Sequence, residues 1–445
     1  MINSSISNKQ KKILLFVKYY VKNSQHKVNV ANSAICYFHN YGNFISSSYL
    51  KLKFYGIKYF AKFTKNLIQN FYSVIKTENY ICIKKNTSKV FKNLIISHVS
   101  KDDFLKDGSY FDKYFSLNSK KFKNSLFFLN SIDGFCPKNL SSNLIVYKKE
   151  KSNLSYLGLI INFFRYLFTK NFSLRSTLHE FNFLSQFSLK IFPHLMKTVY
   201  DNNFKKIILF YEAQPYQNNF INELKKKKNK VKTIGFYHSG LLPLHTSLVF
   251  REGAPDKLLI SGGFQKKYCE KYLGWPKNRV FNVSSFRYSK KSVINQKNVI
   301  FLPYAISRSD TILNSLEVLF KKSKKKTLPI LSIKNHPATL NSKKHLLLIK
   351  NIKDIIKRNK EKFSNRSKNV SIFIGSTTSI ILALEQKKEV IHICEDPIFD
   401  SFNSKIWKNL VITRLDNFVF KYRLKQNKRI LNIQKNNKNK IRQYL

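Results

Sequence analysis

Short apolar runs alternate with amphipathic stretches from residue 205 onward. Runs rich in β-branched and aromatic residues predict strands, and the longer stretches between them have the period of helices. The first predicted strands cover residues 205–212, 231–238, 256–262 and 279–283. Helices are expected after Pro215 and over 264–275. Strands and helices in this order form βαβ units, which build a parallel sheet.

The alternation stops at the polar stretch SSFRYSKKSVINQK (284–297) and then restarts. The second set of predicted strands covers residues 298–305, 327–334, 370–375 and 389–394, with helices over 310–323, 345–359 and 376–386. The predicted fold class is therefore α/β, with two Rossmann-like doubly wound domains facing a cleft. Ligands bind such sheets at the carboxyl ends of the strands.

These patterns set the expected domain boundaries. We predict an N-terminal domain over 1–288, a linker over 289–296, a C-terminal domain over 297–420 and a basic tail over 421–445. Residues 1–200 belong to the first domain but give no legible pattern. The tail is expected to form either a closing helix or a loose arm toward anionic lipid.

Two apolar runs in the first 200 residues bear on membrane association. The run 13–21 is short and contains Lys18, so it predicts a strand or a helix and not a signal peptide. The run 157–168 is too short to cross about 30 Å of hydrocarbon. We expect a buried helix there, with an interfacial helix as the alternative, in which Arg165 and Lys170 reach the lipid headgroups.

The chain is strongly basic, with a formal net charge of +57. Such a chain favours anionic partners: phospholipid headgroups, phosphorylated substrates or nucleic acid. The lysines are spread along the whole length, without an RNP-like motif or a basic recognition helix, so no specific nucleic acid is expected as a partner. The five cysteines form no C-x-x-C pair, which suits a reducing cytoplasm and predicts no metal site.

The stretch IGSTTSIILALEQ (374–386) is the most specific local signal. A strand ends at Gly375, and four hydroxyl residues then open an apolar helix: Ser376, Thr377, Thr378 and Ser379. One hydroxyl would suffice to cap the helix. Four hydroxyls beside free amides suit a nucleotide phosphate, which we favour over capping alone. The chain contains neither G-x-G-x-x-G nor a P-loop motif.

The stretch IKNHPATL (333–340) follows another predicted strand. Pro337 biases His336 away from helical conformation. We expect Lys334, His336 and Pro337 to face the same cleft as the hydroxyl run, where a protonated imidazole would stabilise a departing phosphate. An ordinary core histidine is the alternative.

The order of the K-x-HP stretch and the later GSTTS stretch resembles the C-terminal half of bacterial GT-B glycosyltransferases of surface polysaccharides. It is most similar to the capsule-type sialyl- and Kdo-transferases, which carry HP and Ser-Ser/Thr motifs. Upstream, YEAQP, GFYHSG, PDKLLISG and LGWPKNRVFNVSSFRY look like surface carbohydrate biosynthesis proteins. The resemblance covers roughly residues 205–395.

The resemblance implies an inverting glycosyltransferase that needs neither metal nor cofactor. Its donor would be a nucleotide sugar, with a CMP-sugar such as Kdo or a sialic-acid-like sugar favoured. Its acceptor would be a growing cell-surface polysaccharide, as in capsule or lipopolysaccharide, or a lipid-linked molecule. In these families the HP histidine and the Ser-Ser/Thr motif contact the donor phosphate. Those roles would fall on His336, Ser376, Thr377 and Thr378.

The chain departs from the family pattern at two places. Leu382 stands where relatives often carry an acidic residue that holds the ribose. The acidic pair before glycine, which supplies a catalytic base, is matched only in part by Arg251-Glu252-Gly253.

The catalytic base must be a carboxylate or an imidazole that takes a proton from an acceptor hydroxyl. Glu212 is the first candidate because YEAQP follows a predicted strand, although an acid that caps the next helix is an equal alternative. His238 and Glu252 are the second and third candidates. Tyr211 and Gln214 would position the acceptor.

Together these features predict a cytoplasmic protein, peripheral on the anionic inner leaflet of the plasma membrane. The alternatives are a polyol-phosphate transferase, a non-catalytic GT-B protein that binds a sugar nucleotide, and a basic nucleic-acid-binding protein.

Overall fold

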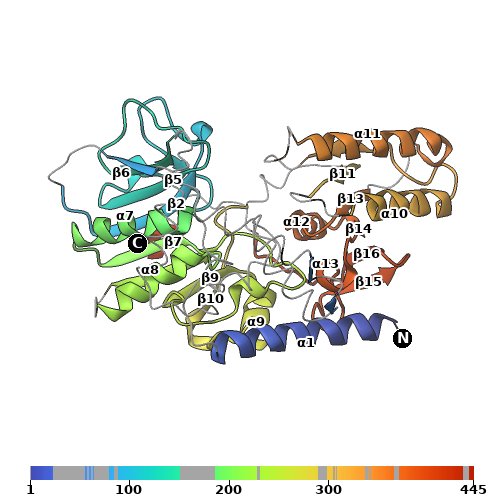
Figure 1. The fold of residues 1–445 in the computed structure, drawn as a ribbon, viewed down its shortest axis with the longest axis horizontal. Helices are drawn as coiled ribbons and strands as arrows, with labels where there is room; N and C mark the ends of the chain where they lie inside the picture. Colours follow the sequence, from blue (N-terminus) through green and yellow to red (C-terminus); the bar gives the residue numbers. More distant parts are fainter. Residues whose placement is uncertain are drawn as a thin grey trace.

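The computed structural model folds into two α/β domains, each built on one large sheet (Figure 1). It describes most of the chain, in these ranges: 2–23, 56–57, 60–61, 64, 80–84, 89–150, 186–227, 231–288, 298–303, 306, 308–335, 339, 342–364, 370–433 and 440–444. The predicted linker 289–296 and the apolar run 157–168 lie outside these residues.

The N-terminal sheet has eight strands in the order β1-β6-β5-β2-β7-β8-β9-β10. Its strands are β1 (Tyr80–Lys84), β2 (Asn93–Val99), β5 (Ser125–Ser131), β6 (Leu144–Lys149), β7 (Lys206–Phe210), β8 (Lys232–Tyr237), β9 (Lys257–Ser261) and β10 (Val280–Val283). All neighbours pair in parallel except β1, which runs antiparallel to β6. The helices of this domain are α7 (Gln186–Tyr200), α8 (Pro215–Lys226) and α9 (Gly263–Tyr272).

The strand order places a topological switch point in this sheet. After the edge strand β1, the chain forms β2, adds β5 and β6 on one side of it, and then returns to add β7 to β10 on the other side. The switch therefore lies between β2 and β7, which pair through Asn93↔Lys206 to Ile96↔Leu209. In open α/β sheets the ligand crevice lies outside the carboxyl ends of the strands at this point.

Both faces of the N-terminal sheet are buried, which explains its nearly continuous apolar strands. Successive residues of a strand point to opposite faces. In β7, Ile207 and Leu209 belong to one apolar cluster, and Ile208 and Phe210 belong to the other. The strand is therefore fixed by packing from both sides.

The C-terminal sheet has six strands in the order β12-β11-β13-β14-β16-β15. Its strands are β11 (Val299–Phe301), β12 (Ser332–Lys334), β13 (Val370–Ile374), β14 (Glu389–Ile393), β15 (Leu410–Arg414) and β16 (Val419–Leu424). Its helices are α10 (Ser309–Lys322), α11 (Lys343–Arg358), α12 (Ser379–Glu385) and α13 (Pro397–Asp400). The first strand, β11, lies between β12 and β13, so this switch point lies between β11 and β13. The two sheets confirm the predicted class, α/β with two Rossmann-like domains in the GT-B manner.

The strands and helices predicted beyond residue 205 are present, but β11 and β12 have only three residues each where eight were predicted. The stretch 327–334 forms β12 only over its last three residues. Pro329 has no amide hydrogen, so it cannot continue a ladder. Likewise β11 stops at Phe301, before Pro303. The unparsed part of the sequence supplies β1, β2, β5 and β6, half of the N-terminal sheet.

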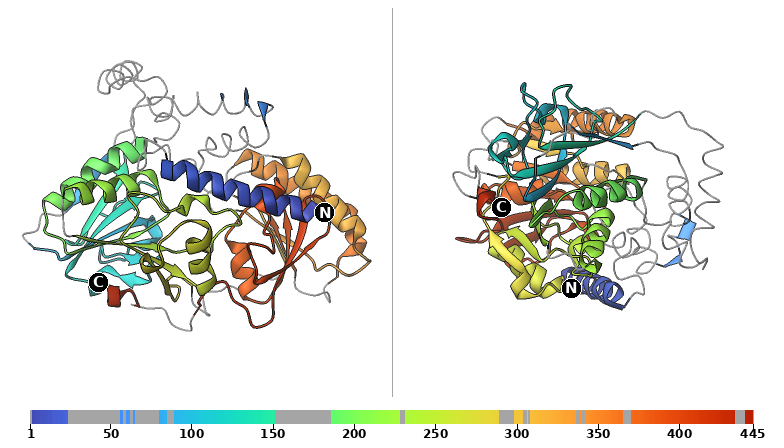
Figure 2. Two further views of the ribbon diagram at one scale, coloured as in Figure 1. Left: turned by 90° about the horizontal axis from the view of Figure 1, so that it is seen from below. Right: turned by 90° about the vertical axis from the view of Figure 1, so that its left-hand side faces the viewer.

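Two segments tie the domains together. Helix α1 (Ile2–Asn23) lies along both domains (Figure 2) and contains the apolar run 13–21. Gln10 Nε2 of this helix donates hydrogen bonds to the carbonyls of Ile398 (2.8 Å) and Ser401 (2.7 Å). At the far end of the helix, the Lys18 side chain lies next to Gly274 of the N-terminal domain.

The second connection is the C-terminal segment, which the sequence predicted as a closing helix or a loose arm. Strand β16 takes up its first residues, and an extended segment then returns to the N-terminal domain. Ile430 and Leu431 are buried, and the Asn432 carbonyl accepts a hydrogen bond from the Ser285 amide at 2.8 Å. Residues 425–433 are thus neither helix nor loose arm, because their apolar side chains pack against the protein.

Candidate functional site

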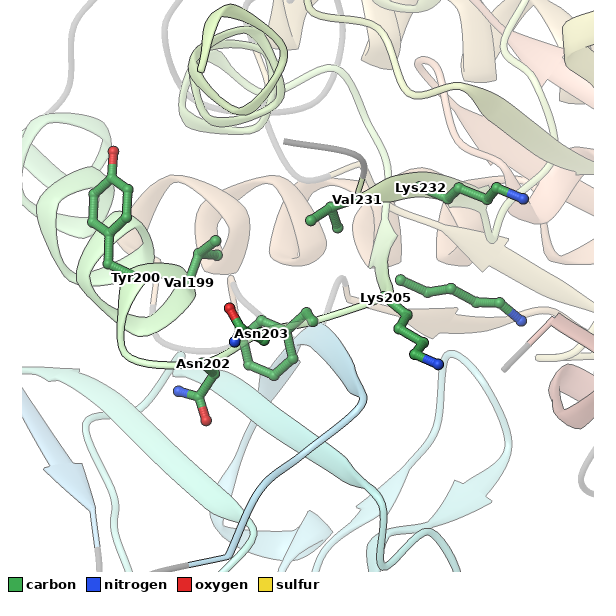
Figure 3. Close-up of a pocket in the computed structure, with 9 residues that line it drawn as sticks. Val199, Tyr200, Asn202, Asn203, Lys205, Val231 and Lys232 are labelled. Atoms are coloured by element: carbon green, nitrogen blue, oxygen red, sulfur yellow. The ribbon is translucent and has the colours of Figure 1, made fainter. Parts of the chain in front are cut away.

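One open pocket of the N-terminal domain lies at the wrong edge of the sheet for a ligand crevice. It has a volume of about 590 Å³ and is lined by residues that precede β7 and β8, among them Lys205 and Val231 (Figure 3). These residues mark the amino ends of the strands. The candidate site is therefore sought at the opposite, carboxyl edge.

Polar side chains gather at the carboxyl ends of the strands around the N-terminal switch point. His98 is the penultimate residue of β2, Glu212 follows β7, and His238 follows β8. Tyr114 and Arg287 come from the segments after β2 and β10. The Tyr114 and His238 ring centroids are 4.7 Å apart, and the Arg287 Cζ lies 5.4 Å from the Tyr114 ring centroid. We call these five residues the carboxyl-edge cluster.

Glu212 and His238 form the central pair of this cluster. Glu212 Oε1 lies 3.8 Å from His238 Nε2, and both side chains are largely buried. Gln214 Nε2 donates to Glu212 Oε2 at 3.0 Å, and Gln217 Oε1 accepts the backbone amides of Glu212 and Gln214. The start of α8 thus holds the Glu212 carboxylate toward the imidazole.

The second ring nitrogen of His238, Nδ1, has different surroundings from Nε2. The side chain is 7% exposed, and its Nδ1 is buried with no hydrogen-bond partner among the residues that the structure describes. Burial, Arg287 and His98 together hold the pKa of His238 well below its usual value, so the imidazole is neutral. A carboxylate oxygen 3.8 Å from Nε2 favours the tautomer that carries its proton on Nε2 and its lone pair on Nδ1. A neutral imidazole has a lone pair that can take a proton from a hydroxyl, and the neighbouring Glu212 carboxyl group would stabilise the cation that forms.

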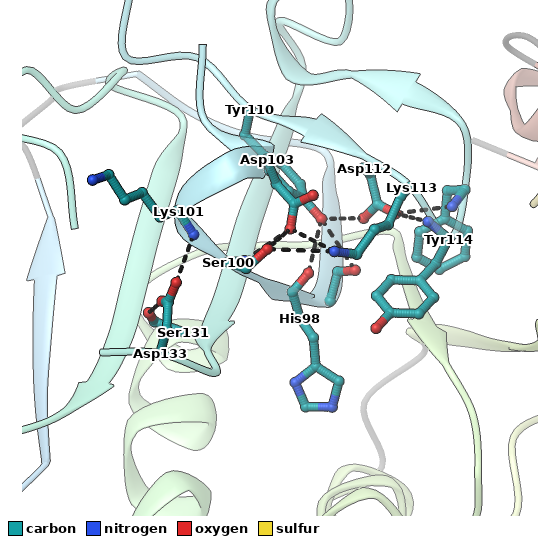
Figure 4. A network of polar contacts seen from close by, with 12 residues as sticks. His98, Ser100, Lys101, Asp103, Tyr110, Asp112, Lys113, Tyr114, Ser131 and Asp133 are labelled. Atoms are coloured by element: carbon teal, nitrogen blue, oxygen red, sulfur yellow. Dashed lines mark hydrogen bonds and ion pairs between the residues drawn. The ribbon is translucent and has the colours of Figure 1, made fainter. Parts of the chain in front are cut away.

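A buried network fixes the position of Tyr114 (Figure 4). Asp112 Oδ1 accepts the backbone amides of Tyr114 and Phe115, both at 2.8 Å. Asp112 Oδ2 accepts the Tyr110 hydroxyl at 2.6 Å. The Tyr110 hydroxyl also lies 3.2 Å from the His98 carbonyl, which links the network to the end of β2. The network therefore sets the Tyr114 ring against His238.

His98 is held from two sides. Its Nδ1 lies 2.9 Å from Asn130 Nδ2 of the neighbouring strand β5, and its ring lies 4.2 Å from the Phe210 ring. Burial lowers the pKa of His98 to about 4, so this imidazole is neutral as well. His98, Tyr114 and Arg287 were not predicted as site residues from the sequence. His98 stands at the end of the apolar run NLIISHV, just as His238 stands at the end of its own strand. The same position in the pattern could therefore have indicated His98.

Three residues that were predicted for the acceptor side lie outside the carboxyl-edge cluster: Tyr211, Gln214 and Glu252. The Tyr211 side chain is fully buried, and its hydroxyl donates to Asn218 Oδ1 at 2.8 Å, so it points into the core and not toward an acceptor. Gln214 holds Glu212. Glu252 is exposed and precedes β9, so it lies near the amino edge of the sheet and apart from the carboxyl-edge cluster.

In the C-terminal domain the hydroxyl run lies at the switch point. Gly375 follows β13 with φ +63°, and an added Cβ there would lie 3.3 Å from Cβ of Pro303, which follows β11. The loops after the two strands on either side of the switch therefore meet at Gly375. This is the edge at which the sequence predicted phosphate binding.

The hydroxyls of this run are half-buried and differ in their contacts. Ser376 Oγ donates to Asp400 Oδ1 at 3.0 Å. Thr377 Oγ1 accepts the Ser379 amide at 3.3 Å. Thr378 makes no side-chain capping bond to α12. Part of the run thus has structural partners, and α12 itself is only seven residues long.

The remaining donor-side candidates lie near this edge. Lys334 is an exposed residue at the end of β12, the edge strand beside β11. His336 and Pro337 lie outside the described residues, so their roles stay predictions.

The carboxyl edges of the two sheets meet at the loop that follows β8. The Gly240 backbone packs against Ile381 of α12 so closely that an added Cβ would lie 2.9 Å from Cβ of Ile381. Trp407 Nε1 of the C-terminal domain donates to the Pro243 carbonyl at 3.3 Å. Gly240 is two residues after His238, and Ile381 is three residues after Thr378. The hydroxyl run and the carboxyl-edge cluster are therefore joined through this contact.

Across the described ranges, His, Cys, Asp and Glu side chains do not gather in groups of three or more that could hold a metal ion. The predicted absence of a metal and of a cofactor stays a prediction. Within the part of the chain that the structure describes, none of the helices combines the length and the apolar character needed to cross a membrane.

Comparison with known proteins gives structural similarity alone. No family model matches this sequence, and no curated protein sequence matches it significantly. A glycosyltransferase from Rickettsia africae ESF-5 is similar in structure, with 12% identity, 68% of this chain and 79% of that chain covered, and a TM-score of 0.33. UDP-GlcNAc 2-epimerase from Neisseria meningitidis is also similar in structure, with 10% identity and a TM-score of 0.37. The match covers 72% of this chain and 86% of that chain.

An alpha/beta-galactoside alpha-2,3-sialyltransferase from Photobacterium phosphoreum gives 10% identity, 68% and 90% coverage and a TM-score of 0.32. These TM-scores are below 0.5. The function proposed below therefore depends on the geometry of this chain and not on these similarities.

Proposed function

We propose that this chain is a glycosyltransferase that moves a sugar from a nucleotide-activated donor to an acceptor hydroxyl. The observation that carries the proposal is the pair of His238 and Glu212 at the carboxyl edge of a Rossmann-like sheet, with His238 Nδ1 buried and without a partner among the described residues. The sequence resemblance to GT-B enzymes of surface polysaccharides supports the same reading.

On the acceptor side, His238 Nδ1 takes the proton of the attacking hydroxyl as the new glycosidic bond forms. The imidazole then becomes a cation, and the Glu212 carboxylate stabilises it at Nε2. This arrangement makes His238 the base and Glu212 its positioning partner, whereas the sequence alone ranked Glu212 first. Direct attack by the hydroxyl on the anomeric carbon inverts its configuration, in agreement with the predicted inverting reaction.

On the donor side, the segment Gly375 to Ser379 receives the nucleotide phosphate, together with Lys334 and His336. Backbone amides and hydroxyls at such a strand-to-helix turn suit an anion. We favour a CMP-sugar donor and a polysaccharide or lipid-linked acceptor on the inner face of the plasma membrane. The net charge of +57 supports attraction to an anionic leaflet.

Nucleotide binding tests the donor side. We expect one of CMP, CDP, UDP and GDP to raise the unfolding temperature, because a ligand at about 100 times its dissociation constant adds about 2.7 kcal/mol of stability. The shift should shrink in His336→Ala and in Ser376→Ala. It should persist in Ser332→Ala, a matched control whose exposed side chain lies at the start of β12.

A short DNA duplex completes the panel. Stabilisation by the duplex alone, unchanged in His336→Ala, would contradict the proposal and return His336 to the role of an ordinary structural histidine.

A further inference from the structure

The guanidinium of Arg287 lies at the edge of the candidate site without an acceptor. Its Cζ is 5.4 Å from the Tyr114 ring centroid and 5.2 Å from the Tyr288 ring centroid. The guanidinium thus lies over two aromatic rings. Among the residues that the structure describes, none accepts a hydrogen bond from its N–H groups or forms an ion pair with it.

Contacts of the neighbouring residues fix the backbone around Arg287. Ser285 donates its amide to the Asn432 carbonyl at 2.8 Å, and Ser285 Oγ accepts the Tyr288 amide at 2.9 Å. Between them, Phe286 is buried against Phe236, with ring centroids 4.5 Å apart. The protein therefore holds Arg287 at this edge by contacts on both sides of it.

Two other arginines of the same domain donate hydrogen bonds to backbone carbonyls. Arg279 donates to the carbonyls of Pro255 (2.6 Å) and Asp256 (3.2 Å), and Arg251 donates to the Val249 carbonyl at 3.1 Å. Arg287 has no such bonds, although a partly buried guanidinium without an acceptor is costly. A missing anionic group would explain the difference.

We propose that Arg287 binds an oxyanion of the acceptor substrate, a phosphate or carboxylate group carried close to the hydroxyl that receives the sugar. A planar guanidinium binds such groups through two parallel hydrogen bonds. Tyr114 contacts both Arg287 and His238, so an acceptor bound beside this ring would lie close to both groups. This inference rests on the proposed function, because it names the acceptor of the same site.

Histidine NMR tests the proposal at a single residue, which avoids the non-specific binding expected of a strongly basic protein. The protein is labelled with ¹⁵N-histidine, and the His238 signals are assigned with His238→Gln. The probes are glycerol phosphate, glucuronate, a short-chain phosphatidic acid and neutral glucose. We expect at least one anionic probe to shift the His238 signals, and glucose to shift them at least tenfold more weakly at equal concentration.

The variant Arg287→Gln should weaken the binding of that probe at least tenfold. Arg358→Gln is the matched control, because this exposed arginine pairs only with Glu317 on the surface of the C-terminal domain and removes the same charge. A response to soluble glycerol phosphate or glucuronate identifies a free anionic sugar or polyol. A response to phosphatidic acid alone identifies a lipid headgroup.

Two results would overturn the inference. Equal binding of the anionic probes by Arg287→Gln and the wild type would show that Arg287 does not bind them. Loss of nucleotide binding in Arg287→Gln would assign the anion to the donor instead. Failure of the proposed function looks different: no nucleotide would bind the wild type, whereas the Arg287-dependent response of His238 to anions would persist.

Discussion

Replacement of His238 by glutamine is expected to lower the turnover of the nucleotide-sugar donor by about 10²–10⁴-fold. Glutamine removes the imidazole that accepts the proton, while it keeps a polar group of similar size. The hydroxyl run of the C-terminal domain is untouched, so the dissociation constant of the nucleotide should stay within about twofold. The effect should therefore appear in kcat and not in donor binding.

The measurement is the release of nucleotide, followed by ³¹P NMR, from wild type and variant at saturating donor. Glu212→Gln should also be slow, because an amide does not stabilise the imidazolium as a carboxylate does. His194→Gln is the matched control, since His194 lies on α7, next to the Tyr147 ring and away from the carboxyl edge. Equal turnover in His238→Gln and His194→Gln would remove His238 from the chemistry.

A steep loss of stability in mild acid is the second large effect that we expect. Three buried histidines and the half-buried His98 have lowered pKa values: His98 and His392 to about 4, His245 to about 3, and His238 well below its usual value. Burial is the main cause in each case. In the unfolded chain their pKa values return to about 6.5.

The sign follows from proton uptake. Below about pH 6.5 the unfolded histidines bind protons that the folded ones do not, so the free energy of unfolding falls as the pH falls. Each histidine contributes about 1.4 kcal/mol per pH unit between its unfolded and folded pKa values. Burial raises the pKa values of Asp112 and Glu385, which act in the opposite direction. We therefore expect a net uptake of about two to four protons near pH 5.

Urea unfolding at several pH values between about 7 and 5 measures this slope. The variant His245→Gln should take up about one proton fewer on unfolding than the wild type. His194→Gln should change the slope less, because His194 is only partly buried and its pKa is less strongly lowered. A free energy of unfolding that stays constant over this pH range would show that the buried histidines are not held neutral.

The second half of the fold was predictable because its strands are buried on both faces and separated by helices of clear period. The first 200 residues were not, for a physical reason. Residues 100–124, between β2 and β5, form a long connection without an α-helix. Polar contacts such as those of Asp112 and Ser119 stabilise it. Such a segment leaves no period in the sequence, so the strands beside it were missed as well.

Only part of the candidate site was open to prediction from the sequence. Glu212 and His238 were proposed because each follows a strand, and the structure places them within 3.8 Å of each other, while their roles stay predictions. The surroundings of His238 Nδ1 and the place of Arg287 over the Tyr114 ring depend on distant segments that meet only in three dimensions. Tyr211 also follows a strand, but its ring is buried and its hydroxyl bonds to Asn218, which the sequence pattern does not reveal.

The central claim is that this chain moves sugars from nucleotide donors with His238 at the reacting hydroxyl. The most direct test is to incubate the wild type with CMP-, UDP- and GDP-sugars, with an anionic acceptor such as glycerol phosphate, and to record nucleotide release and new glycosidic products. We predict consumption of one donor class by the wild type, with turnover at least 10²-fold lower in His238→Gln. Donors left intact by a folded wild type that binds their nucleotides would contradict the claim and leave a protein that binds sugar nucleotides without turnover.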